Sequence, residues 1–209
     1  PGGSLSAVEI LVTLYFDQMH LDPAHPEDPN RDRFLLSKGH AAPVLYSALA
    51  RRGFFDPALL PTLRQLDSPL QGHPHREKLP GLDCSSGSLG QGLSVANGLA
   101  LAARRTGRSY RTYCLLGDGE VQEGQIWEAA MTAAQFSLDN VCAVVDDNGV
   151  QLDGPTKDIM DVEPLGAKFA AFGWEVLDVD GHSLAALRDA FRIAAATQGR
   201  PTVLIAHTV

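Results

Sequence analysis

The sequence predicts an α/β fold in which a mostly parallel β-sheet is covered by helices on both faces. The 209 residues are 44% hydrophobic and 20% charged, which is ordinary for a globular protein with a buried core. Short apolar runs typical of strands alternate with segments of helical periodicity. Strands separated by helices imply right-handed crossovers, and these make the strands parallel and cover both faces of the sheet. We expect one domain over residues 1–209.

The first helix is expected over residues 6–20. Ser6 and Glu9 match the capping box Ser-x-x-Glu, and apolar residues follow at helical spacing. After a polar, Pro-rich loop and a short apolar run, a second helix is expected over residues 41–52. Gly53 is its stop signal.

Residues 66–92 are rich in Gly, Pro and Ser and contain few apolar runs. A segment this irregular inside a compact domain is usually functional. After it, strands and helices alternate regularly. The expected strands are 112–116, 141–145, 174–179 and 202–206. The expected helices are 93–105, 123–137, 164–172 and one that is capped by Ser183.

Two of these helices carry an apolar stripe on one face. In the helix capped by Ser183 the expected core residues are Leu184, Leu187, Phe191 and Ala194. In the helix over 123–137 the stripe consists of Trp127, Ala130, Met131 and Ala134. We interpret the second stripe as core or as a subunit contact, because its alanines allow close helix packing.

Charge and cysteine content limit the class of protein. The net charge of -8 argues against nucleic acid or an anionic membrane as a partner. An anionic ligand would therefore need a local device, such as a metal ion or a helix N-terminus. The three cysteines are odd in number and contain no CxxC pair, so we expect neither a disulfide framework nor a zinc knuckle. No signal peptide or long apolar span is visible, and we expect a cytoplasmic protein.

Two oxygen-bearing side chains follow neighbouring predicted strands. Asp118 lies in the turn Gly117-Asp118-Gly119, and Asn148 follows the next strand. Ligands of parallel α/β sheets bind at the carboxyl ends of the strands, where both residues lie. Asp118, Asn148 and the Val150 carbonyl would offer a cation hard oxygen ligands, which suit Mg²⁺ or Ca²⁺. Gly119 opens the turn toward a helix whose N–H groups can meet a phosphate. The alternative is an ordinary βα turn with a capping aspartate.

The longer motifs resemble the transketolase family. The run Gly117-Asp118-Gly119-Glu120-x-x-Glu123-Gly124-x-x-Trp127-Glu128-Ala129 is followed by Val145-Asp146-x-Asn148-x-x-Gln151-x-Asp153-Gly154. Further matches are Pro1-Gly2-Gly3-Ser4-Leu5-Ser6, Ser37-Lys38-Gly39-His40-Ala41, Gly72-His73-Pro74, Gly87-Ser88-Leu89-Gly90-Gln91-Gly92 and Asp180-Gly181-His182. The resemblance covers essentially the whole chain, but only the N-terminal third to half of a full transketolase. It implies the thiamine diphosphate-binding fold, in the domain that binds the diphosphate.

The resemblance also implies roles for single residues. Asp118, Asn148 and the Val150 carbonyl are the implied metal ligands, for Mg²⁺ or Ca²⁺. The residues implied to contact the thiamine diphosphate are Gly87, Leu89, Gly119 and Leu152. His40 and His73 are implied to line the cleft beside the diphosphate and the reacting substrate oxygens.

Glu123 resembles the acid that pairs, across the dimer, with the glutamate that activates the cofactor. Each of these roles has a simpler alternative. Glu123 would otherwise only favour a helix N-terminus through the macrodipole. His40 would otherwise be a turn residue. We expect His182 to order its turn rather than to take part in catalysis.

The implied function is that of a split transketolase, with this chain as the N-terminal subunit of a heterotetramer. It would transfer a two-carbon ketol unit from a ketose phosphate to an aldose acceptor, with thiamine diphosphate and Mg²⁺. The pyrimidine-binding and C-terminal domains would come from a C-terminal partner subunit, and the chain would self-associate across a dimer interface. Deoxyxylulose-phosphate synthase also has a Gly-Asp-Gly, but the run from Glu123 to Ala129 points away from it.

Two alternatives stay open. One is a transketolase-like subunit of specialised metabolism, with a different donor or acceptor. The other is a non-catalytic, cofactor-binding subunit, although such a protein would have no physical need for Asp118, Asn148 and both histidines. The sequence also departs from the family pattern. Ser88 stands where proline is common, Asp147 stands where a bulkier residue is frequent, and two family histidines would lie before Pro1 and after Val209.

Overall fold

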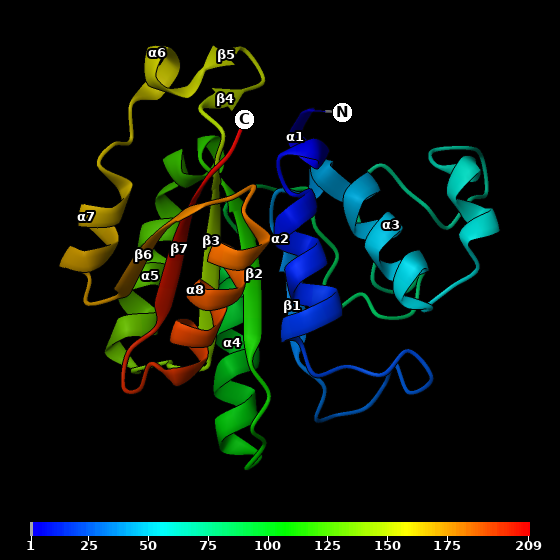
Figure 1. Ribbon diagram of the computed structural model, residues 1–209, viewed down its shortest axis with the longest axis horizontal. Coiled ribbons are helices and arrows are strands. Elements are labelled where there is room, and N and C mark those ends of the chain that lie inside the picture. The colour runs from blue at the N-terminus through cyan, green and yellow to red at the C-terminus, as the bar shows by residue number, and fades with distance from the viewer. Residues whose placement is uncertain (1) are drawn as a thin grey trace.

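A five-stranded, fully parallel sheet forms the centre of the molecule, with the strand order β1-β2-β3-β7-β6 (Figure 1). This computed structural model describes residues 2–209. The strands are β1 (Arg33–Leu36), β2 (Thr112–Gly117), β3 (Val141–Asp147), β6 (Glu175–Asp180) and β7 (Thr202–His207). The predicted α/β class with a mostly parallel sheet is confirmed. Because all five strands run in one direction, their carboxyl ends meet at the same edge of the sheet.

Helices pack on both faces of this sheet. The first hydrophobic core includes α2 (Val8–Thr13), α3 (Ala42–Arg52) and α8 (Leu184–Ala196), and the second includes α4 (Gly92–Arg105), α5 (Gly124–Gln135) and α7 (Leu165–Ala171). Successive side chains of β3 alternate between the two cores. Cys142 and Val144 lie in the first core, and Ala143 and Val145 lie in the second. Burial on both faces explains why the strands are continuous apolar runs.

Several short elements complete the chain. They are α1 (Gly2–Leu5), the π-helix η1 (Leu14–Gln18), the 3₁₀ helices η2 (Gly39–Ala41), η3 (Pro57–Thr62) and η4 (Gly119–Gln122), the hairpin of β4 (Val150–Gln151) and β5 (Gly154–Pro155), and α6 (Thr156–Met160). The hairpin is not predicted from the sequence, because two-residue strands are too short to show a period. Within the described chain, residues 66–91 form no helix or strand, in agreement with their composition.

Most predicted helices are found within one or two residues of their expected ends. The prediction over 41–52 corresponds to η2 and α3. Gly53 ends α3 in the left-handed region at φ 102°, where its N–H donates to the Leu49 carbonyl. The prediction over 93–105 corresponds to α4. None of the helices in residues 2–209 is long and apolar enough to cross a membrane.

The helix predicted over 6–20 is wrong at its start. The α-helix begins at Val8 and continues as a π-helix to Gln18, and Ala7 in the N-cap position makes no side-chain cap bond. The Ser6 hydroxyl instead donates to the Asp146 carboxylate at 2.6 Å. The capping box fails because α2 begins at Val8, so Ala7 and not Ser6 occupies the N-cap position.

The predicted core stripe of α8 is partly wrong, and the stripe of α5 belongs only in part to the core. Met131 of α5 is 49% exposed and Leu184 of α8 is 47% exposed. The buried face of α5 consists of Ile126, Ala129, Ala130 and Ala133, so the helix is rotated relative to the predicted stripe. In α8 the buried repeat begins one turn later than expected, at Leu187. The Trp127 ring lies 5.1 Å from that of Phe169 in α7, so this part of the stripe is core.

Removal of the Phe191 ring should destabilise the sheet from one face. Phe191 is fully buried, and its ring meets that of Tyr113 edge-on at 6.0 Å. We expect Phe191→Ala to lower the free energy of unfolding by about 3–5 kcal/mol, because the cavity adds to the lost transfer energy. Ile193→Ala, at a half-exposed position of the same helix, should change it by less than about 1 kcal/mol. Urea unfolding of both variants checks this, and equal losses would contradict the assigned face of α8.

Candidate functional site

The site predicted from the sequence lies at the carboxyl edge of the sheet, where β2 and β3 end side by side. Gly117 at the end of β2 is in register with Asp146 of β3. The Asp118 amide donates to the Asp146 carbonyl at 3.2 Å, which extends the contact one residue past β2. Asp118 and Asn148 therefore follow adjacent strand ends, as the parallel-sheet argument predicts.

The Asp118 carboxylate is buried and has two hydrogen-bond donors. It accepts from the Gly119 amide at 2.8 Å and from the Thr156 hydroxyl at 2.8 Å. Burial raises the pKa of Asp118 above its usual value, although these two hydrogen bonds act in the opposite direction. A cation beside this carboxylate would favour its charged form, so the donor set fits a metal ion.

Asn148 and Val150 bring further oxygens to this edge. The Asn148 side-chain oxygen accepts from the Val150 amide at 3.0 Å, and its amide nitrogen donates to the Ser6 hydroxyl at 3.3 Å. Val150 is 61% exposed at the start of the β4–β5 hairpin. Among the described residues, no three His, Cys, Asp or Glu side chains lie close enough to hold a metal. A cation here would therefore depend on amide, carbonyl and ligand oxygens in addition to Asp118.

A buried ion pair between Lys38 and Asp146 lies beneath these residues. The two side chains are 2% and 0% exposed, and the Lys38 ammonium lies 2.5 Å from Asp146 Oδ2. Asp146 also accepts from the hydroxyls of Ser6 at 2.6 Å and Thr208 at 2.5 Å. Lys38 follows β1, and Thr208 follows β7. Lys38, Asp146 and Thr208 have no role predicted from the sequence, where only their position at or after a strand end distinguishes them.

The two cleft histidines come from different segments and lie near each other. His40 lies in η2 after β1, and His73 lies in the irregular segment. Burial lowers the pKa of His40, and the nearby charges of Lys38 and His73 lower it further. His40 is therefore the neutral base near pH 7, able to accept or share a proton.

The loop that carries Gly87 and Leu89 packs tightly against both histidine segments. A Cβ at Gly87, whose φ is 141°, would lie 3.1 Å from His73 Cγ, and one at Gly39 would lie 2.7 Å from the Ser86 hydroxyl. That hydroxyl is buried and has no hydrogen-bond partner in the described chain. Leu89 is 38% exposed. The close glycine contacts and the unpaired hydroxyl fit a cradle for a ligand.

Glu120 is a second buried carboxylate that sequence reasoning missed. It accepts from the Ser37 hydroxyl, from the Gly90 amide at 2.9 Å and from the Gly117 amide at 3.1 Å. Burial raises its pKa, against these three hydrogen bonds. Glu120 thus joins the ends of β1 and β2 to the Gly87–Gln91 loop. Its signal in the sequence is its position directly after Gly-Asp-Gly.

Of three other predicted residues, Glu123 and Leu152 lie at the exposed rim and Gly119 is partly buried. Glu123 occupies the N-cap position of α5 without a side-chain cap bond, and it is exposed. Burial beside a second acid is not seen within residues 2–209, so the pairing implied by the family would need another polypeptide. Leu152, at the β4–β5 turn, is 99% exposed. Gly119 lies under this hairpin, because a Cβ there would lie 2.9 Å from Gln151 Cβ.

Two more histidines lie at this edge of the sheet. His182 Nδ1 is 3.1 Å from the Glu9 carboxylate, and its Nε2 accepts from the Val209 amide. This agrees with an ordering role for His182. His207 bridges the carboxylates of Asp147 at 2.9 Å and Asp178 at 3.2 Å, so it ties together β3, β6 and β7.

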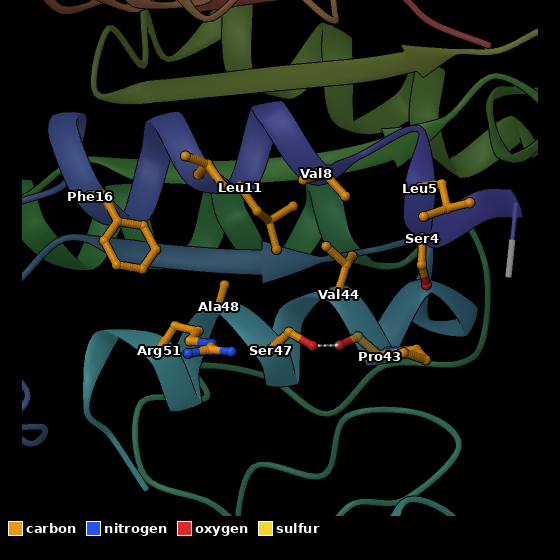
Figure 2. Close-up of a pocket in the computed structure, with 11 residues that line it drawn as sticks. Ser4, Leu5, Val8, Leu11, Phe16, Pro43, Val44, Ser47, Ala48 and Arg51 are labelled. Atoms are coloured by element: carbon orange, nitrogen blue, oxygen red, sulfur yellow. Dashed lines mark hydrogen bonds between the residues drawn. The ribbon is translucent and has the colours of Figure 1, made fainter. Parts of the chain in front are cut away.

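An apolar cavity lies elsewhere, between α2 and α3 (Figure 2). This groove of about 510 Å³ is lined mainly by apolar side chains, among them Leu5, Val8, Val12, Phe16 and Val44. Its one charged lining residue in the described chain is Arg51. The groove therefore lacks the oxygen donors found at the carboxyl edge, and we place the chemistry at that edge.

Comparisons with known proteins identify the family of this chain. A family profile described as transketolase, thiamine diphosphate binding domain, matches residues 1–209, of which Pro1 lies outside the described structure. The 6-deoxy-6-sulfo-D-fructose transketolase subunit SqwG of Clostridium sp. (strain MSTE9) is 45% identical over 208 residues, covering 100% of this chain and 76% of that protein. One subunit of the apulose-4-phosphate transketolase of Phocaeicola vulgatus is 42% identical, covering 99% of this chain and 73% of that protein.

Solved structures show the same likeness over a smaller share of their length. The transketolase of Campylobacter jejuni superimposes with a TM-score of 0.88 at 33% identity. The match covers 95% of this chain but 32% of that chain. The chain thus spans about a third of this transketolase and about three-quarters of the two subunits.

The lowered pKa of His40 predicts a pH dependence of stability. In the unfolded chain a histidine binds its proton near pH 6.5, but in the folded protein His40 binds it at a lower pH. Between these two pKa values the unfolded state holds more protons, so stability rises with pH and is lost as the pH falls below about 6.5. We expect His40→Asn to flatten the fall in Tm between pH 7 and pH 5, measured by circular dichroism. His75→Asn, in an exposed loop, is the control, and identical profiles for all three proteins would contradict this.

Proposed function

The chain belongs to the transketolase family, and from this premise we propose that it is the diphosphate-binding subunit of a split transketolase that requires thiamine diphosphate and Mg²⁺. Members of this family transfer ketol groups. The observation that carries the proposal is the position of Asp118 and Asn148, which each follow the end of one of two adjacent parallel strands. This edge combines a buried carboxylate, amide and carbonyl oxygens and a glycine-rich loop.

The metal and the diphosphate would be held by separate sets of groups. Asp118, Asn148 and the Val150 carbonyl would ligate Mg²⁺, whose preference is for oxygen ligands. The cation would offset the charge of the diphosphate, which a chain of net charge -8 does not do by itself. Gly119, Gly87 and the Ser86 hydroxyl would contact the cofactor, with Leu89 and Leu152 as apolar contacts. Bound thiamine diphosphate would supply the electron sink for breaking the carbon–carbon bond.

The chain's own acid–base groups are His40 and His73. The neutral His40 would accept a proton from a substrate hydroxyl, and His73 beside it would orient or return that proton. Lys38 is paired with Asp146, and its charge would add to the effect of burial, which is the main cause of the lowered pKa of His40. Glu123, exposed at the start of α5, would meet the activating acid of a neighbouring subunit.

The rest of the active site would come from other polypeptides. The relatives from Clostridium and Phocaeicola are named as subunits, which supports a C-terminal partner that carries the pyrimidine-binding and C-terminal domains. We propose a heterotetramer formed by self-association of this pair. A ketose phosphate donor and an aldose acceptor are the proposed substrates, and the proposed location is the cytoplasm.

A second candidate differs only in the sugar. The relatives at 45% and 42% identity are named for 6-deoxy-6-sulfo-D-fructose and for apulose-4-phosphate. A protein of specialised metabolism, acting on one such modified ketose, is therefore the alternative. Steady-state kinetics with ordinary ketose phosphates and with these two sugars would separate the two candidates by their kcat/KM ratios.

Asp118→Asn tests whether the edge holds the metal. Asparagine keeps one oxygen but removes the charge that attracts Mg²⁺, so we expect Mg²⁺-dependent binding of thiamine diphosphate to be lost in calorimetric titration. The control is Asp153→Asn, in the turn of the β4–β5 hairpin. It also removes one negative charge, but from a residue outside the predicted set of metal ligands. It should bind the cofactor as the wild type does. Unchanged binding by Asp118→Asn would place the cation elsewhere.

Reconstitution tests the split enzyme. Residues 1–209 alone should show no ketol transfer, because under the proposal the acid that activates the cofactor comes from the partner subunit. Mixed with a purified C-terminal partner, thiamine diphosphate and Mg²⁺, it should transfer a ketol unit from a ketose phosphate, measured by coupled assay of the aldose product. Absence of transfer from a mixture that has bound the cofactor would exclude the catalytic role and favour a non-catalytic, cofactor-binding protein.

A further inference from the structure

Ser6 lies between the buried ion pair and a predicted metal ligand. Its side chain is almost fully buried, at 1% exposure. The Ser6 hydroxyl donates to Asp146 Oδ2 at 2.6 Å, and the hydroxyl oxygen accepts from Asn148 Nδ2 at 3.3 Å. Three segments therefore meet at one hydroxyl: the turn before α2, strand β3 and the residue that follows β3.

The chemistry of these groups gives the chain of hydrogen bonds one direction. Asp146, paired with the Lys38 ammonium, is a carboxylate and can only accept. A serine hydroxyl has a single proton, and Ser6 gives it to Asp146. Toward Asn148, Ser6 has only lone pairs to offer. The atom of Asn148 that faces Ser6 must then be the donor, Nδ2, and its oxygen must face the other way.

That orientation is the one a metal ligand requires. With Nδ2 held by Ser6, Asn148 Oδ1 lies on the side of the Val150 amide, from which it accepts at 3.0 Å. An amide oxygen has a second lone pair, which remains for a cation. A flipped amide would present Nδ2 to the cation and could not bind it.

We infer that Ser6 is a positioning residue, which turns the Asn148 amide so that its oxygen faces the metal. This inference rests on the proposed function, because it concerns the ligand of the proposed Mg²⁺. It goes beyond that function by assigning a task to Ser6 and to the Lys38–Asp146 pair. The Lys38–Asp146 pair fixes the proton of Ser6, and Ser6 in turn determines which atom of the Asn148 amide faces the cation.

Ser6→Ala tests the inference against a matched control. Thr208→Val removes another hydroxyl bonded to the same carboxylate, at 2.5 Å on Asp146 Oδ1, and within residues 2–209 Thr208 makes no side-chain bond to Asn148. The readouts are the Mg²⁺ concentration at half-saturation of thiamine diphosphate binding, followed by tryptophan fluorescence, and the Tm of the ligand-free protein. We expect Ser6→Ala to raise the Mg²⁺ midpoint about tenfold, the lower end for groups that orient metal ligands. Thr208→Val should lower the Tm without moving the midpoint.

Asn148→Asp provides a second measurement that does not depend on the folding of Ser6→Ala. An added negative charge alone would strengthen Mg²⁺ binding. The direction of the hydrogen bonds predicts weaker binding, since the aspartate oxygen facing Ser6 has no donor. Replacing Ser6 by alanine in that variant should then recover part of the loss, as a non-additive double-mutant cycle.

The outcomes separate the inference from the proposed function. No Mg²⁺-dependent binding of thiamine diphosphate by the wild-type protein would overturn both. Wild-type binding, with equal Mg²⁺ midpoints for Ser6→Ala and Thr208→Val, would overturn the role of Ser6 alone. Stronger Mg²⁺ binding by Asn148→Asp would do the same.

Discussion

The buried pair of Lys38 and Asp146 is the interaction on which the carboxyl edge of the sheet depends. Removing two charges from water costs several kcal/mol for each ion, and their attraction offsets this only with good geometry and further hydrogen bonds. Asp146 has both, since two hydroxyls complete its oxygens. The pair also ties β1 to β3 at an edge where the strands end. Loss of either partner would leave an uncompensated buried charge, a cost of about 3–5 kcal/mol.

The fold gives up local stability near this pair. Helix α2 has Ala7 at its N-cap position and begins without a side-chain cap, where a capping serine would contribute about 1 kcal/mol, and the nearby Ser6 hydroxyl is bonded to Asp146. The carboxylates of Asp118 and Glu120 are buried beside it, and burial raises the pKa of both. Such concentration of buried charge at one edge is typical of a functional site and does not benefit the core.

The sequence predicts what depends on local periodicity and on the parallel-sheet rule. The periodicity of each strand and helix depends on residues close together in the sequence, so the order of elements can be inferred. The parallel-sheet rule then places Asp118 and Asn148 at adjacent strand ends. The Lys38–Asp146 contact joins residues 108 positions apart and leaves no local pattern. The same applies to Ser6. Its capping box is a local pattern, but its hydrogen bond joins it to Asp146, 140 positions away. Glu120 and Glu123 look equivalent in sequence, and only the 3₁₀ turn of η4 buries one and exposes the other.

The solvent-exposed side of the carboxyl edge carries apolar side chains. The buried network lies beside the oxygens of the predicted metal ligands, and the segment over 150–160 leaves Val150, Leu152 and Met160 at least 60% exposed. Apolar side chains gathered beside a polar site are a common mark of a surface that binds another molecule. Glu123 is exposed on the neighbouring helix start and meets no partner acid within the described chain. This arrangement supports the proposal that the cofactor and a second polypeptide cover the edge together, because the exposed apolar side chains and the exposed Glu123 have no partners within the described chain.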